Sequence, residues 1–175
     1  MTTMPGRRTN DSSREQSVMV IKRERDIAGA EAAARIVVQV HERLVDFLKP
    51  GQTLADIDAF VGQSLKSLKA KSCFINYRIP GHDAFPSHSC LSVNDCVVHG
   101  THDMSDAPLE VGDIISIDIG SKHNGWIGDA AWTYAIRECS DEARRLMDVG
   151  KESLRRGIAA MQPGAKLIGW AEAVQ

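Results

Sequence analysis

Apolar residues recur at helical spacing over residues 23–48, which predicts a long amphipathic helix that ends before Pro50-Gly51. A second helix is expected after Thr53, whose hydroxyl can cap it together with Asp56 at the third helical position. The apolar stripe expected for the first helix is Ile27, Ala30, Ala34, Val37, Val38, His41, Leu44, Val45 and Leu48. The stripe expected for the second is Ile57, Phe60, Val61, Ser64, Leu65 and Leu68.

A third helix is predicted after Ser140, because an N-cap serine followed by two acidic residues suits a helix start. It should end at Pro163-Gly164, with an apolar face made by Leu146, Val149, Leu154, Ile158 and Met161. Residues 160–167 repeat the order of helix, Pro-Gly break and helix seen at residues 47–54, at an offset of 113. Residues 167–175 then open a further helix that has no cap and would leave its apolar face partly unburied. We therefore expect an incomplete chain that stops early in a second structural half.

The run of residues 112–120 is rich in β-branched side chains and predicts a strand. The Asn124-Gly125 step that follows is a strong hairpin signal, because both central residues of a type I′ turn need a positive φ. Pairing across that turn makes the numbers of paired residues sum to 249, so Asp118 lies opposite Ala131. Asp129 is then the diagonal neighbour of Asp118 on the same face, at about 7 to 8 Å between backbones.

Two carboxylates in this position can bind one or two cations, but they can also be solvated aspartates on the outer face of a hairpin. Asp118 lies within the apolar run Ile114–Ile119, which we expect to be buried on both faces. A buried carboxylate needs a cation or several hydrogen-bond donors. Spacing and burial alone leave a metal site and a structural hydrogen-bond network as equal alternatives.

The composition limits the class of protein that carries Asp118 and Asp129. The chain has 175 residues, 43% hydrophobic and 25% charged, with a net charge of -2, which fits one soluble domain and implies no nucleic-acid partner. No run of 18 or more apolar residues or secretory signal is present, so a cytoplasmic protein without a membrane partner is expected. Residues 1–17 are polar and predict a disordered tail rather than a targeting peptide. The four cysteines, Cys73, Cys90, Cys96 and Cys139, lack paired spacing and are expected to be reduced and partly buried.

Several segments resemble a known family, the type I methionine aminopeptidases, metallopeptidases with the pita-bread fold. Residues 90–100, Cys-Leu-Ser-Val-Asn-Asp-Cys-Val-Val-His-Gly, are similar to the family signature that ends in His-Gly. Residues 109–118 and 125–129 are similar to the two strands that carry the family's first metal-binding aspartates. The resemblance covers about residues 17–175.

The resemblance implies two divalent ions, cobalt, manganese, iron or zinc, with Asp118 chelating one and Asp129 bridging both. It implies that one His and two Glu from beyond Gln175 complete the site. Catalytic His99 would hydrogen-bond the substrate near the scissile peptide rather than bind metal. The pocket for methionine would be lined by Phe85 and Cys90, although both can also be plain core residues.

This chain departs from the family pattern around that pocket. His82, Ala84 and His88 replace an aromatic residue, a glycine and a serine, and Thr101-His102 stands where the family often has Ile-Pro. The remaining histidines, His41, His82, His88, His102 and His123, are expected to be surface or packing residues.

The expected fold class is α/β (α+β): a pita-bread domain with an antiparallel sheet covered by helices. Residues 1–17 would be the tail, 18–139 the first half with the metal-binding hairpin, and 140–175 the start of a truncated second half. The expected function is metal-dependent removal of the initiator methionine from nascent proteins by a monomeric enzyme, with a ribosome contact left open. These 175 residues alone are expected to be inactive. The alternatives are a pita-bread peptidase acting on Xaa-Pro bonds and a non-catalytic binding module.

Overall fold

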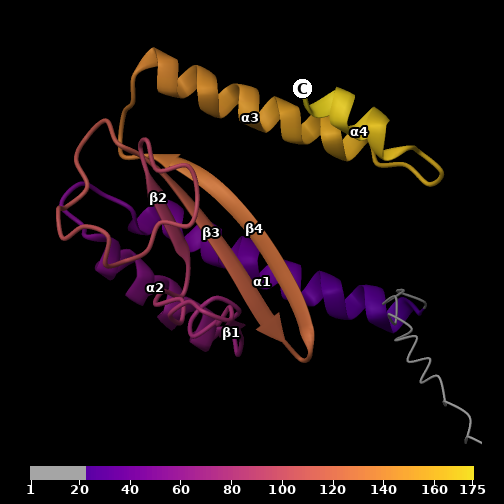
Figure 1. Ribbon diagram of the computed structural model, residues 1–175, viewed down its shortest axis with the longest axis horizontal. Coiled ribbons are helices and arrows are strands. Elements are labelled where there is room, and N and C mark those ends of the chain that lie inside the picture. Colours follow the sequence, from indigo (N-terminus) through magenta and orange to yellow (C-terminus); the bar gives the residue numbers. More distant parts are fainter. Residues whose placement is uncertain (1–22) are drawn as a thin grey trace, which may run out of the picture.

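The computed structural model describes residues 23–175, so the predicted tail at residues 1–17 lies outside the part described. The secondary-structure elements are α1 (Glu24–Phe47), α2 (Leu54–Ser67), β1 (Lys71–Ser72), β2 (Cys90–Val93), β3 (Ile114–His123), β4 (Trp126–Ala135), α3 (Asp141–Ala160) and α4 (Leu167–Val174) (Figure 1). Over residues 23–175, no helix combines the length and apolarity needed to cross a membrane.

The four strands form one antiparallel sheet around β3. The predicted hairpin is confirmed, because β3 and β4 pair from His123 and Trp126 next to the turn down to Asp118 opposite Ala131. Both turn residues have positive φ, +50° at Asn124 and +86° at Gly125, as a type I′ turn requires. On its other edge β3 pairs with the shorter strands β1 and β2, neither of which was predicted.

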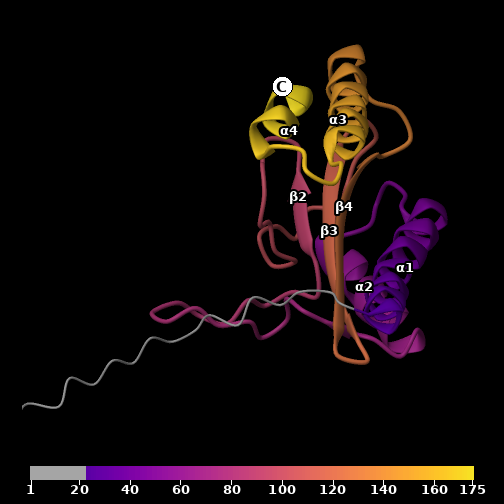
Figure 2. The ribbon, with the colours of Figure 1, turned by 90° about the vertical axis from the view of Figure 1, so that its right-hand side faces the viewer.

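Helices α1 and α2 cover only one face of the sheet, as Figure 2 shows with the sheet seen on edge. The core lies between them and contains the odd-numbered side chains Ile115, Ile117 and Ile119 of β3, all 0% exposed. The even-numbered residues of β3 up to Asp118 are only half-buried. The expectation that this run would be buried on both faces was therefore wrong, because among residues 23–175 helices pack on one face of it alone.

The buried stripe of α1 also differs from the predicted one. Ile27, Val38 and Val45 were expected to face the core but are 57%, 41% and 61% exposed. The predicted positions Val37, His41 and Leu44 are buried as expected. The helix also buries Asp26, Ala33, Ile36 and Val40, which were not predicted. The close approach of Gly128 on β4 to the backbone of Ala33 fixes this rotation, since a Cβ at Gly128 would lie 2.5 Å from the carbonyl of Ala33.

Both predicted N-caps are confirmed. Thr53 and Asp56 form a reciprocal capping box, in which the amide of Asp56 donates to the Thr53 hydroxyl at 3.2 Å and the amide of Thr53 donates to the Asp56 carboxylate at 2.9 Å. At the start of α3, the hydroxyl of Ser140 accepts a hydrogen bond from the amide of Ala143 at 3.1 Å. Each cap satisfies a backbone donor that a helix start leaves free.

Helices α3 and α4 lie side by side, beyond one end of the sheet (Figures 1 and 2). They meet at Gly157, where a Cβ would lie 2.7 Å from Val174 and 3.0 Å from Trp170. The apolar residues predicted for the third helix are 58% to 69% exposed, namely Leu146, Val149, Leu154, Ile158 and Met161. As predicted, α4 has no side-chain cap and leaves Leu167 and Ile168 exposed.

Candidate metal centre

Asp118 and Asp129 project from the same face of the hairpin, on the side away from α1 and α2. Asp129 pairs with Gly120, two residues along β3 from Asp118, so the two aspartates are diagonal neighbours as predicted. A Cβ at Gly120 would lie only 3.1 Å from Oδ2 of Asp129. The Asp129 carboxylate therefore leans over Gly120 toward β3, and the missing side chain of the glycine gives it room.

The charges of the two carboxylates are poorly compensated. Burial raises the pKa of Asp118, the charge of Asp129 raises it further, and His99 opposes both effects. Burial also raises the pKa of Asp129, although a hydrogen bond from Asp118 counteracts it. A cation between the two groups would favour their charged forms, because an opposite charge at close range lowers the pKa of a carboxyl group.

His99 reaches the aspartate pair from the loop that follows β2. It has a left-handed backbone (φ +60°), which is uncommon for a residue with a side chain, and it is exposed. The next residue, Gly100, is packed against β2: a Cβ there would lie 2.1 Å from the carbonyl oxygen of Leu91. The charge of His99 opposes the rise in the pKa of Asp118, so the loop places His99 within electrostatic range of that carboxylate.

Of the two predicted pocket residues, Cys90 lies directly beside Asp118, whereas Phe85 is linked to the aspartates through other residues. Cys90 on β2 is opposite Asp118 on β3 and is 6% exposed. Phe85 meets Phe74 edge to face, with ring centroids 6.2 Å apart, and a Cβ at Gly120 would lie 2.7 Å from the Phe74 ring. Phe85 therefore connects to the aspartate pair through Phe74 and Gly120.

Cys73 also lies at this site, and the sequence analysis missed it. Its amide donates to the carbonyl of Gly120 at 2.9 Å, and the charge of Asp129 adds to the effect of burial in raising its pKa. Burial and the nearby aspartates raise the pKa of Cys90 to about 11. Both thiols are therefore protonated at neutral pH and present a soft, weakly polar wall. No spacing signal marked Cys73, because its place depends on β1 pairing with a strand about 50 residues later.

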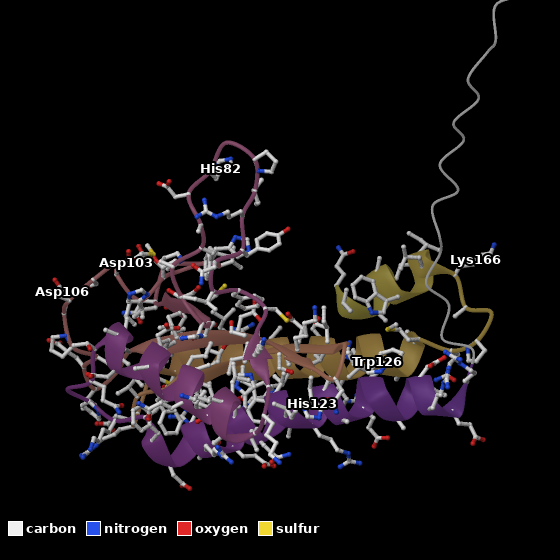
Figure 3. The ribbon with its side chains drawn as sticks, turned by 90° about the horizontal axis from the view of Figure 1, so that it is seen from below. His82, Asp103, Asp106, His123, Trp126 and Lys166 are labelled. Carbon is white, nitrogen blue, oxygen red and sulfur yellow. The ribbon has the colours of Figure 1, made fainter. Side chains whose placement is uncertain are left out.

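Three other histidines have roles apart from this site, as expected. His41 is 0% exposed, with Nδ1 2.8 Å from the Tyr134 hydroxyl and Nε2 3.1 Å from the carbonyl of Ala130. His82 lies at the tip of a projecting loop, far from the hairpin turn beside which His123 lies (Figure 3). Nδ1 of His123 lies 3.1 Å from the carbonyl of Lys69. None of the three touches the aspartate pair.

Residues 23–175 contain no group of three or more His, Cys, Asp and Glu side chains able to hold a metal ion together. Asp118 and Asp129 nevertheless fit such an ion as part of a larger set, since they offer adjacent carboxylate oxygens on one face. Oxygen donors of this kind suit hard or borderline divalent cations. Further ligands would have to come from outside the described part of the chain or from water.

Comparison with known proteins gives a consistent result. Residues 28–175 match metallopeptidase family M24. Methionine aminopeptidase 1 of Bacillus subtilis is 36% identical over 158 residues, covering 90% of this chain and 61% of the relative. The crystal structure of methionine aminopeptidase from Rickettsia prowazekii superposes with a TM-score of 0.83 at 29% identity, over 90% of this chain and 61% of that one. Prolidase from Pyrococcus furiosus has a TM-score of 0.72 at 18% identity, a likeness of fold alone.

Proposed function

The chain belongs to metallopeptidase family M24, and from that we propose that its protein removes the amino-terminal methionine from nascent polypeptides in the cytoplasm. Its fold is the α/β pita-bread fold of the methionine aminopeptidases it resembles. The chain spans 61% of the length of the Bacillus subtilis relative, so the activity belongs to the proposal. A contact with the ribosome and a monomeric state stay predictions.

One observation carries the proposal: two carboxylates from paired strands lean toward each other over Gly120 on the open face of the sheet. We assign Asp118 and Asp129 as ligands of a pair of divalent ions, whose identity among cobalt, manganese, iron and zinc is left to experiment. When bound, such ions acidify a shared water and polarise the scissile carbonyl. The remaining ligands are proposed to lie outside residues 23–175.

The other predicted residues take roles that follow from their places. His99, whose charge acts on Asp118, is proposed to donate a hydrogen bond to the substrate as charge develops at the scissile carbonyl. Cys90 and Phe85 line the space beside the carboxylates, where a thiol and an aromatic edge suit an unbranched thioether. We propose residues 18–139 as the half of the domain that carries this site and 140–175 as the start of the next.

The test compares the complete gene product with its D118N and D129N variants. Each variant is expected to bind Mn²⁺ more weakly by calorimetry and to release methionine from a Met-Ala-Ser peptide ~100-fold or more slowly, because each removes a charged ligand. The matched control is D46N, which changes an exposed aspartate on α1 and should alter neither property. Unchanged metal binding and unchanged release in both D118N and D129N would refute the assignment.

A peptidase acting on Xaa-Pro bonds is the main alternative. The likeness to the prolidase, at 18% identity, concerns the fold and does not favour that substrate. A Xaa-Pro dipeptide included in the same assay separates the two activities. Cleavage of the dipeptide without methionine release would replace the proposed function by this alternative.

A further inference from the structure

The start of the loop that carries His99 is tied to β3, because the amide of Asn94 donates to the carbonyl of Ile114 at 2.9 Å and its Oδ1 accepts from the amide of Ile114 at 3.1 Å. The residues directly before His99 are less covered, since Val97 and Val98 are 84% and 62% exposed. The contacts of the residues after His99 therefore bear directly on its position. Gly100 is one anchor, because the amide of Leu91 donates to its carbonyl at 2.8 Å and its own amide donates to the Ser92 hydroxyl at 3.2 Å.

The second anchor is a paired contact between His102 and Ser87. The amide of His102 donates to Oγ of Ser87 at 2.9 Å, and Nδ1 of the His102 ring lies 2.8 Å from the same oxygen. Because Oγ accepts from the amide, its own proton is free to be donated to Nδ1. Ser87 is 0% exposed, so water does not compete for these bonds.

The two residues after Ser87 are bonded to α2. Asp58 on α2 is 5% exposed and accepts hydrogen bonds from the amides of His88 at 3.0 Å and Ser89 at 2.9 Å. Asp58 thus holds the backbone next to Ser87, and Oγ of Ser87 in turn contacts His102, three residues after His99. The segment that it crosses also carries Phe85 and Cys90, the proposed walls of the methionine pocket.

We propose that His102 is a positioning residue, which fixes the loop that presents His99 to the aspartate pair through its two hydrogen bonds with Ser87. The role of His99 on the substrate rests on the proposed function. The anchoring of His99 by His102 and Ser87 does not depend on any activity. A shift of about 1 Å in a group that touches the reacting atoms can cost 10²-fold in rate. Loss of the anchor should therefore lower kcat and leave KM nearly unchanged.

The experiment measures methionine release by the complete gene product and its variants. S87A removes both hydrogen bonds and H102A removes the one to the ring, and both variants are expected to lower kcat by roughly 10- to 100-fold with KM within about twofold. H102N keeps an acceptor where Nδ1 stood and should recover kcat to within about threefold of the unchanged protein. The matched control is S89A, which removes the hydroxyl of another 0% exposed serine and with it the hydrogen bond from Oγ to Asp58 at 3.0 Å.

S89A should be destabilised toward urea but keep kcat within about twofold, since its hydroxyl does not touch the His99 loop. A second measurement needs no activity: in ¹H–¹³C spectra, the ring signals of His99 should shift in S87A and H102A but not in S89A. If the unchanged protein releases no methionine, the proposed function fails and these ring signals still decide the anchor. Equal losses of kcat in S87A and S89A, an H102N as slow as H102A, or unshifted His99 signals would overturn the proposal.

Discussion

Replacing Gly100 by alanine tests how tightly the loop after β2 is packed. The added Cβ would lie 2.1 Å from the carbonyl oxygen of Leu91 and 2.8 Å from its carbonyl carbon. The optimal separation of nonbonded heavy atoms is about 3.5 Å, so the loop and the strand must move apart by roughly 1 Å. Both contacting atoms belong to the backbone, and no side chain can turn away to relieve the clash.

The cost of that separation follows from the bonds it strains. The hydrogen bond from the amide of Leu91 to the carbonyl of Gly100, at 2.8 Å, must lengthen, as must the bond from Gly100 to Ser92 at 3.2 Å. Overpacking costs about 1 to 3 kcal/mol, and a weakened buried hydrogen bond adds about 1 kcal/mol. We expect G100A to lower the free energy of unfolding by about 2 to 4 kcal/mol, measured by urea denaturation.

Gly150 on α3 provides the control for this substitution. A Cβ at Gly150 would meet nothing within 4 Å, and the residue lies inside a helix. G150A should therefore raise the free energy of unfolding, by about 0.5 to 1 kcal/mol, because alanine loses less backbone entropy in a helix. A G100A protein that unfolds within about 0.5 kcal/mol of the unchanged chain would refute the packing argument.

Two further predictions concern stability. Burial lowers the pKa of His41, so below about pH 6.5 the unfolded chain binds protons that the folded chain does not. The free energy of unfolding should thus be highest above that pH, decline as the pH falls from about 6.5 to the lowered pKa, and level off below it. Urea titrations of H41Q should show a shallower decline, and an unchanged slope would assign the effect to another group. T53A removes the hydroxyl of the capping box and should cost ~1 kcal/mol in urea unfolding, whereas T53S should recover most of the loss. A T53S protein no more stable than T53A would contradict a role for the hydroxyl.

The parts of the fold that were predicted correctly depend on local chemistry. Asn124-Gly125 sets the turn, the turn sets the register, and the register places both aspartates on one face. The two helix caps likewise involve residues only three positions apart. Each of these features is decided within one segment, so the sequence of that segment is enough to predict it.

The parts that were missed depend on contacts between distant segments. The buried face of α1 is set by two close contacts with β4: a Cβ at Gly29 of the helix would lie 2.2 Å from Trp126, and one at Gly128 of the strand would lie 2.5 Å from Ala33. Strands β1 and β2 are 2 and 4 residues long and exist only because β3 offers a partner. Cys73 and the pairing of His102 with Ser87 depend on such contacts and have no motif of their own.

The short span between Asp118 and Asp129 has a consequence for folding kinetics. Contacts close in sequence need little loop-closure entropy, and hairpins assemble in roughly 1–10 μs. The carboxylate pair is thus expected to assemble early, whereas His99 must await the long-range joining of β2 to β3. During that interval the two negatively charged carboxylates repel each other, because the charge of His99 is not yet nearby. A divalent ion in the medium would reduce this repulsion and speed formation of the β3–β4 hairpin.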